Sequence, residues 1–332
     1  MADGSVGVRL DGSQPGITVE HSPTVRAVSF FCGCGGLDLG LLGGFDYLGE
    51  VYRRLPTDIV AAYDFDPRSV ATYRSNVGDH AHVLDLSKAD VTEIPSADLL
   101  IGGFPCQEFS YCGPRQGLRS VRGQLYKVMV KYARYHKPKV IVAENVAGLL
   151  RANNGEDLNT IVEEFRSAGY RSSIWDMRAD DYGVPQMRHR IFLIFVRDDL
   201  HGFPATPSKR EVRINVRDAI SDLLKFPNRK IANQSQYFRA ARAGKGHGQG
   251  DEKSPADGPA YTVRANSRSR VQFHYSRPRR LTVRECARLQ TFPDNFIFKY
   301  DATSNMSQIG NAVPPVLAFC VMEQVVNFLR AI

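Results

Sequence analysis

The chain contains 332 residues, of which 43% are hydrophobic and 23% charged, and its formal net charge is +8. This length allows one large domain with a smaller companion. Every apolar run is shorter than the roughly 20 residues of a membrane-spanning helix. The N-terminus has no apolar stretch of the signal-peptide kind. We therefore expect a cytoplasmic protein without a membrane anchor, in which residues 1–23 form a flexible N-terminal lead-in.

Six cysteines occur, at positions 32, 34, 106, 112, 286 and 320. A chain of this length does not need disulfides to hold its core, and nothing in the sequence points to an oxidising compartment. The spacing Cys32-x-Cys34 could contribute two ligands to a zinc ion, but no second pair stands at ligand spacing. We therefore expect no metal.

The charge is unevenly distributed. Residues 201–300 contain 20 Lys and Arg against 8 Asp and Glu, a net charge of +12, whereas the remainder contains 23 and 27, a net charge of −4. A basic segment beside a mildly acidic one favours a polyanion-binding domain, with nucleic acid as the expected partner. A merely well-solvated surface is the alternative.

Apolar, β-rich runs alternate with amphipathic stretches through the first two hundred residues. The predicted strands are Ala27–Cys32, Asp58–Tyr63, Ala97–Gly102, Lys139–Ala143, Arg171–Met177 and Arg190–Val196. The predicted helices between them are Pro67–Asn76, Gln124–His136 and Leu158–Ala168. This alternation predicts an α/β protein with a doubly wound, mostly parallel sheet covered on both faces.

The pattern changes after Val196. Residues 198–275 are rich in Gly, Pro, Ser, Arg and Lys, and Ala243–Gly258 is predicted to be an exposed loop. A helix is expected at Leu281–Gln290, opened by a capping box of Thr282 and Glu285. The last predicted helix, Pro315–Leu329, is apolar on one side and is expected to pack back on the first domain.

Three short segments suggest a nucleoside-binding site. The glycine-rich run Phe31–Gly40 follows the first strand and opens a helix, Asp64-Phe65-Asp66 ends the second strand, and Asp85-Leu86 offers another acid in an equivalent place. Glycines permit a tight turn, an acid can bind ribose hydroxyls, and an aromatic ring can stack on a base. The spacing G-x-G-G differs from G-x-G-x-x-G, which disfavours a nicotinamide-dependent oxidoreductase. A purely structural turn is the other alternative.

A second group of residues suggests catalysis at the same sheet edge. Cys106 follows Pro105 directly after an apolar strand, and Glu144-Asn145 ends another strand. Gln186-Met-Arg188-His-Arg190 leads into a further strand and adds two guanidinium groups. Open α/β sheets place their chemistry at the carboxyl ends of strands, although a single cysteine is most often a buried structural residue.

The segments GGFPCQEFS, AENV, DYGVPQMRHR, LTVRECARLQTFPDNF and QIGNAVPP occur in this order. With the FxGxGG turn, they resemble the ordered motifs of the DNA (cytosine-5) methyltransferase family of the bacterial restriction-modification type. The resemblance covers residues 27–197 and 279–325. It implies a Rossmann-like fold and a methyltransferase activity that depends on S-adenosylmethionine. The expected catalytic domain is residues 24–197 plus 305–332, and residues 198–304 would form a small, basic target-recognition domain.

The resemblance also implies roles for the catalytic residues. Cys106 would be the nucleophile that attacks carbon 6 of a cytosine flipped out of duplex DNA, and Glu144 would protonate or hydrogen-bond N3 of the ring. Arg190 would hold the cytosine O2, with Arg188 beside it helping to hold the site and a phosphate. Asn145 would brace the site through backbone hydrogen bonds.

The cofactor site implied by the resemblance departs from the family at two places. Asp64, expected to bind the ribose, stands where family members usually carry Glu, and Asp66 could share or take that role. Cys32 and Cys34 replace smaller residues; we expect no functional consequence, although such thiols could be oxidised. The residues expected to bind S-adenosylmethionine are Phe31, Gly33, Gly35, Leu37, Asp64, Phe65, Asp85, Leu86, Pro105, Leu125, Asn311 and Val313.

The DNA contacts are expected in two regions. Ser110–Arg122 is predicted to form a mobile loop that closes over DNA, and the basic segment 198–278 would contact phosphates and bases. The candidates are Ser110, Arg115, Arg119, Arg122, Arg239, Arg242, Lys245, Arg264, Arg268 and Arg270.

The expected partner is duplex DNA, bound by a monomer that is nucleoid-associated. A cognate restriction endonuclease acting on the same site without a stable complex is compatible with the sequence, as is an orphan, regulatory methylase. The alternatives are a tRNA cytosine-C5 methyltransferase of the same fold and a catalytically silent DNA-binding regulator. The large basic segment disfavours the first, and the intact Cys106, Glu144, Arg188 and Arg190 disfavour the second.

Overall fold

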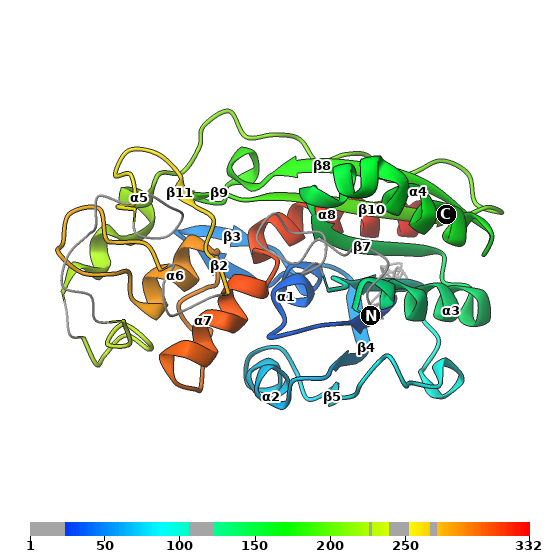
Figure 1. Cartoon of the computed structure of the whole chain (residues 1–332), viewed down its shortest axis with the longest axis horizontal. Coiled ribbons are helices and arrows are strands. Elements are labelled where there is room, and N and C mark those ends of the chain that lie inside the picture. Colours follow the sequence, from blue (N-terminus) through cyan, green and yellow to red (C-terminus); the bar gives the residue numbers. More distant parts are fainter. Residues whose placement is uncertain (1–23, 106–121, 226–227, 239–251, 266–270) are drawn as a thin grey trace, which may run out of the picture.

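The computed structural model describes residues 24–105, 122–225, 228–238, 252–265 and 271–332. Its centre is a seven-stranded sheet in the order β5-β4-β1-β6-β7-β10-β8 (Figure 1). The bounds in that order are β5 Ala81–Val83, β4 Thr57–Asp64, β1 Val25–Phe30, β6 Leu99–Gly102, β7 Val140–Val146, β10 His189–Arg197 and β8 Tyr170–Arg178. The predicted fold class is confirmed, and each predicted strand is present.

The sheet is parallel from β5 to β7, whereas β10 runs antiparallel to both β7 and β8. Between β8 and β10 the chain forms only a 3₁₀ turn, Ala179–Tyr182, and the two-residue strand β9, Gln186–Met187. Such a connection is too short for the crossover helix that parallel neighbours require. The last two strands therefore form an antiparallel pair at the edge of the sheet.

Helices cover both faces of the sheet (Figure 1). Apolar side chains of α1 (Gly36–Leu42), α2 (Pro67–Asn76) and α8 (Pro315–Ala331) belong to one hydrophobic core. Those of α3 (Tyr126–His136) and α4 (Glu156–Arg166) belong to the core on the other face. The predicted helices in these regions are confirmed, with ends that differ by a few residues.

The C-terminal helix packs back on the first domain, as expected. Gly40 of α1 makes this contact possible, since a Cβ there would lie 2.3 Å from the Cβ of Ala318. The segment Ala302–Ala331 is long and apolar enough to cross a membrane, but 67% of its apolar window is buried inside the protein. The helix is also interrupted between α7 (Ala302–Asn311) and α8. Core packing therefore accounts for its apolar composition.

A smaller group of elements lies beside one end of the sheet (Figure 1). It contains α5 (Val216–Ile220), a 3₁₀ turn at Ser221–Leu224, α6 (Val283–Leu289) and β11 (Ala260–Tyr261). The strand β11 pairs in parallel with β9 and so joins this group to the sequence that leads into β10. The three-residue strands β2 (Phe45–Tyr47) and β3 (Glu50–Tyr52) form a hairpin that the sequence analysis did not predict.

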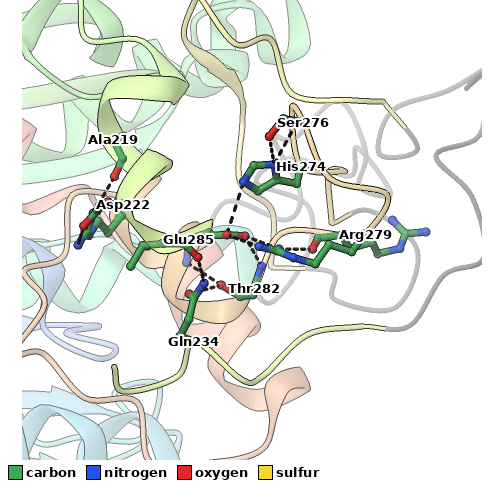
Figure 2. Close-up of polar contacts among 11 residues, drawn as sticks. Ala219, Asp222, Gln234, His274, Ser276, Arg279, Thr282 and Glu285 are labelled. Carbon is green, nitrogen blue, oxygen red and sulfur yellow. Dashed lines mark hydrogen bonds and ion pairs between the residues drawn. The ribbon is translucent and has the colours of Figure 1, made fainter. Parts of the chain in front are cut away.

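The helix α6 begins with the predicted capping box: Thr282 accepts a hydrogen bond from the Glu285 N–H, and the Glu285 carboxylate accepts one from the Thr282 N–H. Figure 2 shows that Glu285 also faces Arg279 and His274. Arg279 binds the buried carboxylate through both terminal nitrogens, at 2.7 and 2.8 Å. Burial lowers the pKa of His274 to about 4, so this imidazole is neutral at physiological pH. Glu285 thus joins the start of α6 to the preceding segment.

The loop predicted at Ala243–Gly258 is described only from residue 252 onward. There Ser254 is 3% exposed and donates a hydrogen bond to Gln272, and Lys253 pairs with Phe273. The prediction of an exposed loop is therefore wrong at Ser254, which backbone pairing holds against the segment around Phe273, whereas Lys253 and Asp257 are exposed as predicted.

Candidate active site

The turn after β1 has the conformation that its glycines allow. Gly33 and Gly35 have φ values of 55° and 94°, and Phe31 has a φ of 56°. A Cβ on Gly36 would lie 2.4 Å from the carbonyl oxygen of Val313, so only glycine permits this approach. The C-terminal segment therefore contacts the glycine-rich turn directly, as expected for Val313.

Asp64 ends β4 and supports this turn. One carboxylate oxygen accepts a hydrogen bond from the Gly33 N–H at 2.9 Å, and the other accepts one from the Asp66 N–H at 2.9 Å. Burial raises the pKa of Asp64, and the hydrogen bonds from the two backbone groups oppose that effect. A carboxylate has about four acceptor sites, so two bonds leave capacity for a ligand.

Asp66 caps the helix that follows it. Its carboxylate caps α2 by accepting from the N–H groups of Arg68 and Ser69 and from the Ser69 hydroxyl. These contacts favour Asp64 as the carboxylate available to a ligand. Phe65, between the two acids, is 72% exposed and presents a free ring face at the strand end.

The other expected cofactor residues differ in exposure. Asp85 is exposed and accepts from the N–H and hydroxyl of Ser87, while Leu86 is buried. Leu37 and Val313 are buried, Pro105 and Leu125 are half-buried, and Asn311 is exposed at the end of α7.

The surroundings of Cys32 and Cys34 disfavour oxidation of their thiols. They are only 7% and 2% exposed. Burial raises the pKa of both thiols far above the ordinary range, and the nearby Asp38 and Asp64 add to the effect. Because the thiolate is the reactive form, both cysteines are shielded and unreactive.

The carboxyl end of β7 brings an acid and a guanidinium together. Glu144 Oε1 lies 2.8 Å from Nε of Arg190 on β10, and both side chains are nearly buried. On the other side, a Cβ on Gly103 would lie 3.0 Å from Glu144 Oε2, so the carboxylate also faces the residue that follows β6. The structure therefore places Glu144, Arg190 and the Gly103-Phe104-Pro105 segment at one edge.

The charge state of Glu144 reflects two opposing effects. Burial raises its pKa, while Arg190 and, more weakly, Arg188 lower it, and burial is the larger effect. Glu144 therefore keeps a proton at higher pH than an exposed glutamate does, while Arg190 still orients its carboxyl group. This combination suits a carboxyl group that hydrogen-bonds or protonates a ligand.

Asn145 braces the same edge, as the resemblance implied. Its amide donates to the Phe104 carbonyl at 3.1 Å, and its side-chain oxygen accepts from the Val146 N–H at 2.9 Å. Asn145 is completely buried. It therefore fixes the chain two residues before Cys106.

Arg188 lies in a different environment from the one expected. It is 2% exposed, and its guanidinium donates to the carbonyls of Val263, Gly310 and Ala312 at 3.1, 3.0 and 2.9 Å. A phosphate contact does not fit this placement, because the guanidinium is enclosed by protein and occupied by backbone oxygens. Arg188 instead ties the segment after β11 and the end of α7 to the strand that carries Arg190.

Gln186 and Gln290 also join these segments, and the sequence analysis assigned no role to either residue. Gln186 donates to the Leu289 carbonyl and accepts from the Val263 N–H, and its amide also contacts Gln290 at 2.6 Å. Gln290 donates to the carbonyls of Ile309 and Ala312. Both glutamines belong to motifs noted in the sequence, but their partners are distant in the chain, so no local pattern could have identified them.

Of the predicted nucleophile and the predicted DNA contacts, the structure describes the side chain of Arg264. Arg264 is half-buried, and its carbonyl carbon lies 2.2 Å from where a Cβ on Gly310 would stand. The predicted nucleophile and most predicted DNA contacts lie outside the described residues: Cys106, Ser110, Arg115, Arg119, Arg239, Arg242, Lys245, Arg268, Arg270 and the side chain of Arg122.

Comparison with known proteins identifies the family. The family described as C-5 cytosine-specific DNA methylase matches residues 25–327. The Type II methyltransferase M.NgoFVII of Neisseria gonorrhoeae is 32% identical over 323 residues, which cover 87% of this chain and 83% of the relative. The Type II methyltransferase M.FnuDI of Fusobacterium nucleatum is 32% identical over 342 residues, which cover 91% and 94%.

A solved structure agrees in fold. The Entamoeba histolytica methyltransferase EhMeth aligns with a TM-score of 0.68 at 18% identity, over 92% of this chain and 98% of that one. The family match spans most of the sequence and includes the glycine-rich turn, Glu144 and Arg190. The protein therefore belongs to the C-5 cytosine-specific DNA methylases and is a DNA cytosine-5-methyltransferase.

Proposed function

We propose that this methyltransferase uses S-adenosylmethionine to methylate a cytosine flipped out of a specific duplex DNA sequence, through a covalent bond between Cys106 and carbon 6. The observation that carries the proposal is the nearly buried pair of Glu144 and Arg190 beside the segment that leads to Cys106. The names of the Type II relatives favour a role in restriction-modification, with a separate endonuclease acting on the same sequence.

The residues at the ends of β1 and β4 fit a nucleoside cofactor. Asp64 retains acceptor capacity for ribose hydroxyls, and Phe65 exposes a ring on which adenine could stack. Gly33 has open space where a side chain would stand, since a Cβ there would meet nothing within 4 Å. S-adenosylmethionine, when bound, supplies the electrophilic methyl group.

The side chains account for the remaining chemistry. The Cys106 thiolate adds to carbon 6, and Glu144 holds a proton at N3, so that the ring takes up the electron pair. Arg190 stabilises the negative charge that develops on O2. After methylation at carbon 5, loss of the proton from that carbon expels the Cys106 thiolate and restores the aromatic ring.

DNA binding is assigned to the basic part of the chain. Residues 201–300 carry a net charge of +12, which suits contact with phosphates. Flipping a base out of the duplex costs a few kcal/mol of stacking and pairing, and protein–DNA contacts must offset that cost. Arg188 does not contribute a phosphate contact in this proposal and acts only through the backbone that it holds.

The first test is expression in a host without cytosine methylation, followed by bisulfite sequencing of its genome. Cytosines protected in one short motif would support the reaction and give the recognition sequence. Glu144→Gln and Cys106→Ala should leave the same cytosines unprotected, while Cys320→Ala, a half-buried residue on α8, should protect them as the wild type does. Absence of protection with folded wild-type protein would contradict the proposal.

The covalent step needs a separate test. Duplex DNA with 5-fluorocytosine at the target should trap the wild-type protein, because fluorine at carbon 5 cannot leave as a proton does. Trapping of Cys106→Ala to the same extent would identify a different nucleophile. Methyl transfer to tRNA in place of duplex DNA would overturn the assigned substrate.

A further inference from the structure

A buried tyrosine lies directly beneath the glycine-rich turn. Tyr73 of α2 is completely buried, and its ring carbons Cδ2 and Cε2 lie 2.9 and 3.2 Å from where a Cβ on Gly35 would stand. Its hydroxyl donates a hydrogen bond of 2.9 Å to Asp38 Oδ1, in the first turn of α1. Tyr73 therefore contacts both the turn and the helix that the turn opens.

The same hydroxyl also contacts a histidine. His80 Nε2 lies 2.9 Å from the Tyr73 oxygen, and His80 is half-buried. Since Tyr73 donates its only proton to Asp38, the Nε2–H of His80 must donate to Tyr73. A chain of hydrogen bonds thus leads from the partly exposed His80, through Tyr73, to the fully buried Asp38.

We propose that Tyr73 is a positioning residue for the cofactor, which holds the Gly33–Gly36 turn in place through Asp38, and that this hydrogen-bonded chain makes cofactor affinity dependent on pH. The inference rests on the proposed use of S-adenosylmethionine. Asp64 holds the turn from the strand side through the Gly33 N–H. Tyr73 and Asp38 hold it from the helix side, so the turn is fixed from two directions.

The pH dependence follows from the proton on Asp38. Burial raises the pKa of Asp38 to about 6, and burial lowers the pKa of His80. As the pH falls toward 6, Asp38 gains a proton, donates to Tyr73, and reverses the order of donors so that Tyr73 donates to His80. The other polar and titratable groups that face this chain are Ser29, Cys32, Asp58, Asp64, Asp79 and His82.

Protonation of Asp38 removes a negative charge from beneath the turn. Because S-adenosylmethionine carries a positive sulfonium, this change removes an electrostatic attraction for the cofactor. The hydrogen bond between Tyr73 and Asp38 also becomes a neutral one, which is weaker than the charge-assisted bond. Both changes weaken cofactor binding at low pH without changing any group that contacts the cytosine.

The test compares Tyr73→Phe with Tyr132→Phe in the full-length enzyme. Tyr132 is also completely buried, but its hydroxyl donates to the Pro95 carbonyl on the other face of the sheet. Tyr73→Phe should raise the calorimetric Kd and the KM for S-adenosylmethionine by about tenfold, the effect of one hydrogen bond to a charged group. The kcat at saturating cofactor should stay within about twofold, and Tyr132→Phe should change neither constant.

The pH profile separates positioning from general stability. The wild-type Kd should rise by roughly tenfold between pH 8 and pH 5, whereas Asp38→Asn, which keeps an acceptor for Tyr73 but cannot ionise, should give a flat profile. Equal Kd values for the wild type and Tyr73→Phe, or parallel profiles for the wild type and Asp38→Asn, would overturn this inference alone. Failure of the wild type to bind S-adenosylmethionine at any pH would instead overturn the proposed function.

Discussion

Glu144 and Arg190 form an ion pair of 2.8 Å between neighbouring antiparallel strands, with only 11% and 13% of their side chains exposed. Arg190 is opposite Val146 in the strand register, while Glu144 is opposite Phe192, so the pair runs diagonally along one face of the sheet. The antiparallel direction of β10 makes this possible, because it brings the start of β10 to the carboxyl end of β7.

Replacing Glu144 by Gln should remove most of the activity while retaining the fold. Glutamine keeps the shape and can still hydrogen-bond, but it cannot transfer a proton, and such a group contributes about 100- to 10,000-fold to a rate. We expect the single-turnover rate of methyl transfer to fall within that range. DNA binding in a mobility-shift assay should change by less than about threefold, since Glu144 carries no phosphate contact.

The pH dependence of that rate has a definite sign. Because burial raises the pKa of Glu144, its protonated form persists to higher pH and is lost as the pH rises. The wild-type rate should therefore decline on the alkaline side of this pKa, and Glu144→Gln should lack that step. An identical pH profile for both proteins would show that the Glu144 proton does not take part in the reaction.

Arg188 should matter for stability rather than for phosphate binding. Arg188→Met keeps the volume of the stem but removes the guanidinium donor from three backbone carbonyls, of which Ala312 retains its hydrogen bond from Gln290. Hydrogen bonds to charged groups contribute about 1.5–3 kcal/mol each, with incomplete additivity, so we expect the free energy of unfolding to fall by about 3 kcal/mol or more in urea titrations.

Arg217→Met is the matched control for Arg188→Met. Arg217 forms an exposed ion pair with Asp257, with side-chain exposures of 54% and 75%. Such pairs contribute at most about 1 kcal/mol. Equal destabilisation by the two substitutions would contradict the structural role assigned to Arg188.

The buried Asp38 should make stability depend on pH. Its pKa is raised from 3.8 to about 6 by burial. For a raised pKa, the stabilising contribution is complete below the unfolded value and disappears as the pH rises through the folded value. Relative to Asp38→Asn, the wild type should therefore lose about 2–3 kcal/mol between pH 4 and pH 7, at about 1.4 kcal/mol per pKa unit.

Urea titrations of both proteins at several pH values measure this difference. Asp46→Asn provides the control, since Asp46 is exposed on β2. If Asp38→Asn and Asp46→Asn follow the same pH dependence, Asp38 does not ionise within the core.

Local patterns were sufficient to predict the elements that carry the site. The apolar runs marked β1, β4, β6, β7, β8 and β10, an amphipathic stretch indicated α2, and the capping box of Thr282 marked the start of α6. These features depend on neighbouring residues, which a sequence displays directly. The ends of the strands then placed Asp64, Glu144 and Arg190 at one edge.

Long-range partners could not be predicted in the same way. The acceptors of Arg188 lie 75, 122 and 124 residues further along the chain. Nothing near Arg188 in the sequence distinguishes a guanidinium that binds carbonyls from one that binds phosphate. The short strands β2, β3 and β5 were missed for a related reason, since three residues are too few to show an alternating pattern.

Gly310 of α7 lies against the backbone of the segment after β11. A Cβ there would lie 2.1 Å from the Ala265 nitrogen and 2.2 Å from the Arg264 carbonyl carbon, so Gly310→Ala must displace backbone. Arg188 binds the carbonyl of Gly310 itself, so this displacement also disturbs that hydrogen bond. A shift of about 1 Å near a reacting group can cost about 100-fold in rate, so we expect a loss of that order in methyl transfer to DNA and a lower Tm.

Gly258→Ala is the control, because its nearest neighbour would be 3.9 Å away. Wild-type activity and Tm in Gly310→Ala would mean that the two segments do not pack as closely as the structure places them.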